Sequence, residues 1–110
     1  MANTFKNSIT GSVGTTGVKV YEAPAATAAT VIGVNVANTA TQNISVSVML
    51  RDNIGNKCVY LVKDALIVQG GSNVMVGGEQ KVVLEATDFL SVTSSLAASA
   101  DVIVSVLELT

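Results

Sequence analysis

The feature that most constrains the fold is an alternation of apolar and other residues between Val31 and Asp52. Ile44 to Leu50 carries an aliphatic β-branched or leucine side chain at every second position, the period of a strand with one buried face. Ile32 to Val36 has the same pattern, and a short polar segment suited to a turn, 38–43, separates the two runs. We therefore predict two strands that either pair in one sheet or face each other across a sandwich.

The rest of the chain has the same character, with short apolar runs separated by turn-forming residues. Nineteen residues are Val, whose branched side chain packs well on a pleated surface. No segment keeps the longer apolar stripe of a core helix. The sequence predicts an all-β, single-domain β-sandwich or jelly-roll-like fold of about 8–9 short antiparallel strands. Beyond the first two runs, the predicted strands are 18–21, 58–62, 65–68, 74–76, 81–85, 89–93 and 102–107.

The two ends of the chain differ in character. Residues 1–17 are rich in Gly, Ser and Thr, so we expect an extended N-terminal arm followed by a β-sandwich domain over 18–110. Phe5 and Ile9 are the large apolar residues of this arm, and they either dock on a neighbouring subunit or pack on the chain's own sheet. The strand 102–107 is apolar at both parities, which predicts a central strand covered on both sides.

The composition limits the classes of partner. Charged residues make up 13% of the chain, against about 25% in an average protein, and hydrophobic residues make up 49%. This balance fits either a Val-rich sandwich or a module that hides its surface in an assembly. The six basic residues are scattered, so we expect no direct binding of nucleic acid. Cys58 stands alone in an apolar run and is predicted to be a small buried hydrophobe.

Catalytic chemistry has no visible basis in this sequence. The chain has no His, and its eight carboxylates are scattered, most of them in predicted turns. Residues 51–57 resemble an acidic calcium loop only in passing, because the ligand spacing fails. Only four aromatic residues are available for stacking sugars or bases. We therefore expect no enzyme, no metal and no cofactor.

The start of the chain lacks the basic and apolar pattern of a signal peptide, and no apolar run approaches the length of a membrane span. We therefore expect synthesis in a cytoplasm and no membrane partner.

Several phrases resemble a known group of proteins. They are 20–48, VYEAPAATAATVIGVNVANTATQNISVSV, then 60–95, which contains YLVK and GGEQKVVL, and the ending ADVIVSVLEL over 100–109. Together they resemble small virion structural proteins of tailed phages that infect cyanobacteria and marine bacteria, over nearly the whole domain. The resemblance implies a location in the virion, synthesis in a host bacterium and no catalytic residues.

This resemblance leads to an expected function with named alternatives. We expect a capsid decoration (cement) protein whose partners are the major capsid protein or other virion proteins, assembled as a homo-oligomer and most simply as a trimer. The alternatives are a neck, tail or fibre component, or a module that binds glycan or protein on the host surface. The candidate assembly contacts are Phe5, Ile9, Met49, Glu79, Gln80 and Lys81. Met49 lies on the Ser-rich face of its strand, and residues 79–81 follow two glycines.

Overall fold

The computed structural model describes residues 3–76 and 81–109, and within them every regular element is a β-strand. No helix long and apolar enough to cross a membrane occurs in these ranges. The strands are β1 (Asn3–Val13), β2 (Val18–Glu22), β3 (Ala28–Asn38), β4 (Ile44–Asp52), β5 (Lys57–Ile67), β6 (Ser72–Val76), β7 (Val82–Leu84), β8 (Phe89–Ser94) and β9 (Ala100–Leu109).

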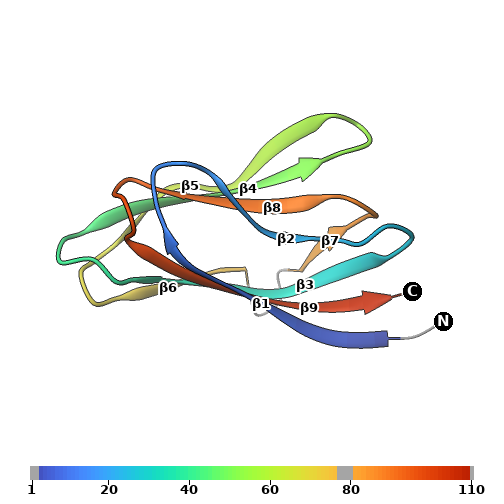
Figure 1. Ribbon diagram of the computed structural model, residues 1–110, viewed down its shortest axis with the longest axis horizontal. Coiled ribbons are helices and arrows are strands. Elements are labelled where there is room, and N and C mark those ends of the chain that lie inside the picture. Colours follow the sequence, from blue (N-terminus) through green and yellow to red (C-terminus); the bar gives the residue numbers. More distant parts are fainter. Residues whose placement is uncertain (1–2, 77–80, 110) are drawn as a thin grey trace.

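The strands form two antiparallel sheets that face each other (Figure 1). The five-stranded sheet has the order β1-β9-β3-β6, with β7 also paired to β3, and the four-stranded sheet has the order β2-β8-β4-β5. β4 and β5 are consecutive strands of the same sheet, and so are β6 and β7. Every other pair of consecutive strands is divided between the two sheets. This order is that of a jelly roll, so the predicted all-β sandwich or jelly-roll-like class is confirmed.

The first two predicted strands face each other across the sandwich rather than pairing. β3 belongs to the five-stranded sheet and β4 to the four-stranded sheet. Asn38 holds the turn between them: its Nδ2 donates to Gln42 O at 2.9 Å and to Ile67 O at 3.0 Å, and its Oδ1 accepts from Ala40 N at 2.8 Å. A buried amide with three partners satisfies the backbone where the chain changes sheets.

The core lies between the sheets and is built mainly from β-branched side chains. Strands β4 and β9 contribute alternate residues to it, as the period-2 pattern requires. In β3 a bulge between Val31 and Gly33 interrupts the alternation, so the buried residues are Ala29, Val31, Val34 and Val36, and Ile32 of the predicted pattern is only partly buried. No buried side-chain nitrogen or oxygen of the described residues lacks a hydrogen-bond partner. The largest fully buried side chains are Ile44, Leu84, Leu90, Val13, Val31, Val34, Val36, Val46, Val48, Val92 and Val102.

The N-terminal segment differs from the expected arm. Residues 3–13 form β1, which pairs with β9 from Asn3 opposite Leu109 to Val13 opposite Ala100, and so becomes an edge strand of the sandwich. The backbone pairing that holds it does not depend on apolar side chains, which is why a segment rich in Gly, Ser and Thr concealed a strand. Val13 is its only buried residue.

Two predicted strands, 58–62 and 65–68, merge into the long edge strand β5. The register to β4 shifts twice along it, and Asp64 adopts a positive φ of 53° while its backbone N–H donates to Ser47 Oγ at 2.9 Å. Such a bulge interrupts the free edge and discourages pairing with other strands. The sequence break at 63–64 was therefore real, but it marks a bulge inside one strand.

Candidate assembly surface

The outer side of the five-stranded sheet carries a concentration of exposed apolar side chains, which we call the apolar face. It consists of the outward positions of β1, β9, β3, β6 and β7. Two cross-strand rows define it through the backbone register. One row contains Phe5, Leu107, Thr30 and Val83, and the other contains Ile9, Ile103, Asn35 and Val74.

These side chains are open to solvent although they are apolar. Phe5 is 76% exposed, Ile9 74%, Val74 65% and Val83 62%. An exposed single apolar residue is ordinary, but a contiguous patch marks a surface that another molecule covers. The face is therefore the best candidate for a contact between this chain and another protein.

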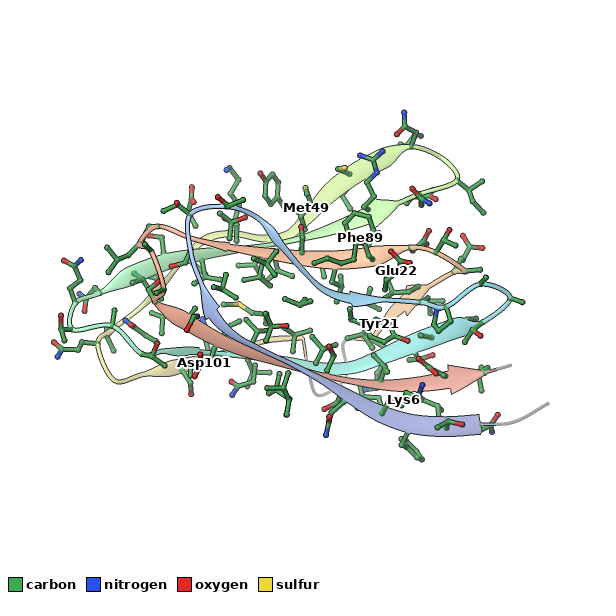
Figure 2. All side chains as sticks on the ribbon, viewed as in Figure 1. Lys6, Tyr21, Glu22, Met49, Phe89 and Asp101 are labelled. Atoms are coloured by element: carbon green, nitrogen blue, oxygen red, sulfur yellow. The ribbon has the colours of Figure 1, made fainter. Side chains whose placement is uncertain are left out.

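Charge is nearly absent from the apolar face. Asp101 is the one charged residue at the outward positions of the strands within the described ranges, and it lies at one end of β9 (Figure 2). Its Oδ1 accepts a hydrogen bond from Ser12 N at 3.0 Å, so part of the hydrogen-bonding capacity of this carboxylate is satisfied within the chain. Covering this face therefore desolvates little charge, which favours burial against a neutral partner.

Two shallow hollows interrupt the face. The larger, of about 340 Å³, is lined by Phe5, Lys6, Asn7, Ile32, Ser105 and Val106. The smaller, of about 170 Å³, is almost wholly apolar and is lined by Ile9, Asn35, Ala37, Asp101, Val102 and Ile103. The first hollow is bordered by the small Ser105 as well as by the bulkier Phe5 and Ile32. The face thus presents both projecting side chains and places that can receive them.

A buried carboxylate fixes the strand that carries Phe5 and Ile9. Glu108 on β9 is only 5% exposed; Tyr21 Oη donates to its Oε2 at 2.5 Å, and Lys6 Nζ lies 3.2 Å from its Oε1. Lys6 and Tyr21 are labelled in Figure 2. The hydrogen bond from Tyr21 lowers the pKa of Glu108 against the opposing effect of burial, and Lys6 lowers it further. Burial and the contact with Glu108 raise the pKa of Tyr21. The cluster joins β1, β2 and β9 across the two sheets.

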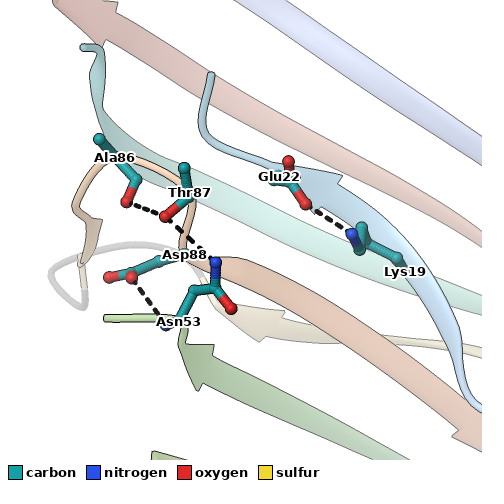
Figure 3. A network of polar contacts seen from close by, with 6 residues as sticks. All are labelled: Lys19, Glu22, Asn53, Ala86, Thr87 and Asp88. Carbon is teal, nitrogen blue, oxygen red and sulfur yellow. Dashed lines mark hydrogen bonds and ion pairs between the residues drawn. The ribbon is translucent and has the colours of Figure 1, made fainter. Parts of the chain in front are cut away.

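A second buried carboxylate organises the loops next to the β2–β8 pair, at the same end of the sandwich (Figure 3). Asp88, 4% exposed, accepts from Asn53 N at 3.2 Å through Oδ1 and from Glu85 N at 3.1 Å through Oδ2. Asn53 Nδ2 also donates to Thr87 Oγ1 at 3.4 Å. Both carboxylate oxygens thus serve backbone N–H groups, which assigns Asp88 to loop structure. It ties the 85–88 turn to Asn53, the first residue of the turn between β4 and β5.

The β4–β5 hairpin projects beyond the body of the sandwich (Figure 1). Ile54 at its tip is 81% exposed, and Val59 and Tyr60 on β5 are about half exposed. Gly55 N donates to Asp52 Oδ1 at 3.0 Å, which closes the turn. The hairpin is a second apolar projection, smaller than the apolar face and separate from it.

Cys58 lies on this hairpin and is exposed, so the prediction of a buried residue was wrong. The apolar run around it pointed to the core, but this part of β5 extends past the opposite sheet, where neither of its sides is covered. The side chain instead contacts Arg51, whose Nη1 lies 3.4 Å from Cys58 Sγ.

The structure separates the candidate contact residues into three groups. Phe5 and Ile9 lie on the apolar face and do not pack on the chain's own core. Met49 is half-buried on the outer side of the four-stranded sheet, opposite Tyr60 (Figure 2). Lys81 is exposed beside β7, and Glu79 and Gln80 lie outside the described residues. Their role as contacts stays a prediction.

Other members of the apolar face were not singled out from the sequence. Ile103 and Leu109 on β9 are each 38% exposed. β9 is central in its sheet, between β1 and β3, but only its inner side is covered by this chain. The double apolar pattern of 102–107 was therefore the available signal. The predicted central position is confirmed, and the prediction that both sides of the strand are covered is wrong within this chain.

No group of three or more metal-ligating residues comes together within the described ranges. The two buried carboxylates lie in separate clusters, each bound by groups that organise strands or loops.

No protein-family model matches the chain, and no curated protein matches its sequence. Solved structures that share the fold include the following two. One comes from Bacillus endospore appendages, described as a family of disulfide-linked pili, with a TM-score of 0.56, 13% identity, and coverage of 98% of this chain and 88% of that one. The other comes from infectious bursal disease virus, Gx strain, with a TM-score of 0.52, 14% identity, and coverage of 96% of this chain and 36% of that one. At these identities the likeness is one of fold, and both similar chains belong to assemblies.

Proposed function

We propose that this chain is a structural protein of a phage virion, specifically a capsid decoration (cement) protein that binds the outside of the shell. The observation that carries the proposal is the apolar face, which is large, nearly uncharged and left uncovered by the chain itself. The phage-like phrases of the sequence and the fold shared with a viral chain support a location in the virion. Its partners are the major capsid protein and further copies of itself.

The physical role of such a protein follows from mass action. A shell filled with DNA is under pressure and is weakest where neighbouring capsomers meet. A module that binds only the assembled, expanded lattice stabilises that lattice by its binding free energy. Contacts of modest strength suffice, because many sites are occupied and oligomeric modules bind through several contacts at once. An oligomer of this chain could match a symmetry axis of the shell.

A second function, in a tail, neck or fibre, has one observation in its favour. The chain from endospore appendages shares this fold over almost its full length and belongs to a pilus. The same apolar face could then be covered by the next subunit along an axis. A host-binding module has less support, since the exposed surface offers Tyr60 and Phe5 but no cluster of aromatic rings to stack a sugar.

The proposal is tested on heads made without this chain. We expect such heads to release their DNA at a lower temperature than complete heads. When the salt concentration is lowered stepwise, they should also release it earlier, at a higher remaining salt concentration. Adding the purified protein should restore the stability of complete heads. Heads that are equally stable with and without the protein would contradict the cement role.

A further inference from the structure

The apolar face has a pattern that repeats about its own centre. On β1, Phe5 and Ile9 each lie two residues from Asn7. On β9, Leu107 and Ile103 each lie two residues from Ser105, the register partner of Asn7. The two apolar rows are therefore about 7 Å on either side of a central polar row, because a strand rises about 3.3 Å per residue.

The pattern extends to the outer strands of the sheet. Val83 on β7 ends the row that begins at Phe5, and Val74 on β6 ends the row that begins at Ile9. A rotation of 180° about an axis that lies along the central row turns the face over. It brings the Phe5 row of the rotated copy opposite the Ile9 row of the original copy, and the Ile9 row opposite the Phe5 row. A surface that matches itself under a two-fold rotation is what an isologous contact requires.

We propose that the apolar face binds the same face of a second copy of this chain, in a two-fold pair whose axis runs along the Asn7–Ser105 row. Phe5 of one copy then meets Ile9 and Ile103 of the other, beside the 170 Å³ hollow that Ile9, Ile103, Asn35 and Ala37 help to line. The Asn7 amide and the Ser105 hydroxyl meet their counterparts at the axis and supply hydrogen bonds. The inference rests on the proposed role as an assembly subunit and names the partner of its main surface.

Charge is compatible with this arrangement. Asp101, the charged residue of the face, lies four residues from Ser105 along β9. The two-fold rotation puts the two Asp101 carboxylates on opposite sides of the axis, about 26 Å apart at about 3.3 Å per residue. This distance exceeds the Debye length of about 8–10 Å at moderate ionic strength, so the two charges do not oppose pairing. The other charged side chain that borders the face in the described strands is Lys6, which lines the larger hollow and pairs with Glu108, so a strongly charged partner would find little complementary charge here.

The size of the face sets the strength of the pair. Four strands about 4.8 Å apart and about eight residues long cover roughly 500 Å² on each copy. The pair then buries about 1,000 Å², close to the lower limit for specific protein interfaces. We therefore expect a weak dimer that dissociates on dilution and becomes fully populated only at the high local concentration of an assembly.

The first test is sedimentation of the purified full chain over a range of concentrations, with matched variants. Phe5→Asp and Ile9→Asp should each weaken dimerisation by about tenfold or more, because each buries a charge without a partner. Ile54→Asp is the control. Ile54 is at least as exposed as Phe5 and Ile9 but lies on the β4–β5 hairpin, so the dimer dissociation constant of this variant should equal that of the wild type. A wild type that stays monomeric at all concentrations, or that forms trimers, would overturn the proposal. So would dissociation by Ile54→Asp alone.

The second test is cross-linking, which reports the axis. Packed sheets lie about 10 Å apart, within reach of a short bismaleimide. In a Cys58→Ser background, Asn7→Cys should cross-link to its counterpart, whereas the exposed turn position Gln42→Cys should not. Equal cross-linking of both variants would contradict the two-fold axis at Asn7. A monomeric protein that still stabilises heads would refute this inference alone, and a dimer that is absent from virions would refute the proposed function alone.

Discussion

Replacing Tyr21 by Phe tests the cluster that holds β1 in place. The substitution removes the hydroxyl and keeps the ring, so Glu108 Oε2 loses the donor that lies 2.5 Å away. Glu108 is buried, and a charged group that loses a hydrogen bond there costs about 1.5–3 kcal/mol. For a domain of this size, this corresponds to a decrease in melting temperature of about 4 °C per kcal/mol.

Lys6→Met provides the matched comparison. It removes the other partner of the same carboxylate, but the Lys6 side chain is 54% exposed, and exposed ion pairs contribute at most about 1 kcal/mol. Urea unfolding should therefore rank Tyr21→Phe as clearly more destabilising than Lys6→Met. A double-mutant cycle between Tyr21→Phe and Glu108→Gln should show a coupling free energy of about 0.5–3 kcal/mol. A loss below about 0.5 kcal/mol for Tyr21→Phe, or the reverse ranking, would refute the reasoning.

Three further predictions concern stability and accessibility. Because the pKa of Glu108 is lowered in the fold, its stabilisation is present above the unfolded value of about 4.3 and is lost as the pH falls through the folded value; the unfolding free energy of Glu108→Gln should change less over that acid range. Leu90→Ala should cost about 2–5 kcal/mol in denaturant unfolding, because Leu90 is fully buried between the sheets, and a cost below about 1 kcal/mol would contradict its place there. Cys58 should react with a thiol reagent in the native protein, and reaction only after unfolding would contradict its exposed position.

The sequence was most informative where one side of a strand is buried. The alternation from Ile44 to Leu50 and from Ile32 to Val36 predicted two strands, because burial on one side imposes period 2, although a bulge between Val31 and Gly33 leaves Ile32 outside the core. It left open whether they pair or face each other. That choice depends on Asn38, whose amide bonds to distant backbone groups such as Ile67 O, and local pattern does not report such contacts.

The sequence was least informative at the edges of the sandwich. β1 has one buried residue, Val13, so no apolar period revealed it, and its pairing with β9 rests on backbone groups that every sequence offers. The prediction that Cys58 is buried failed for the opposite reason. An apolar run in the sequence indicated the core, but it lies in a hairpin that extends away from the core.

The candidate site was half visible from the sequence. Phe5 and Ile9 were identified as apolar residues without an obvious place in a core. Their neighbours Ile103 and Val74 could be joined to them only through the register of β1, β9, β3 and β6. The register between strands that are distant in sequence is set by the whole fold. For that reason the two-fold pattern of the apolar face appears only in the structure.

The central claim, that this chain decorates a phage shell, is tested most directly by its copy number in purified virions. Quantitative mass spectrometry against the major capsid protein gives this number. The account predicts a ratio of about one copy, or about one-third of a copy, per capsid protein, as shell symmetry requires. A ratio of a few per cent or less would contradict it and would assign the chain to the neck, tail or fibre.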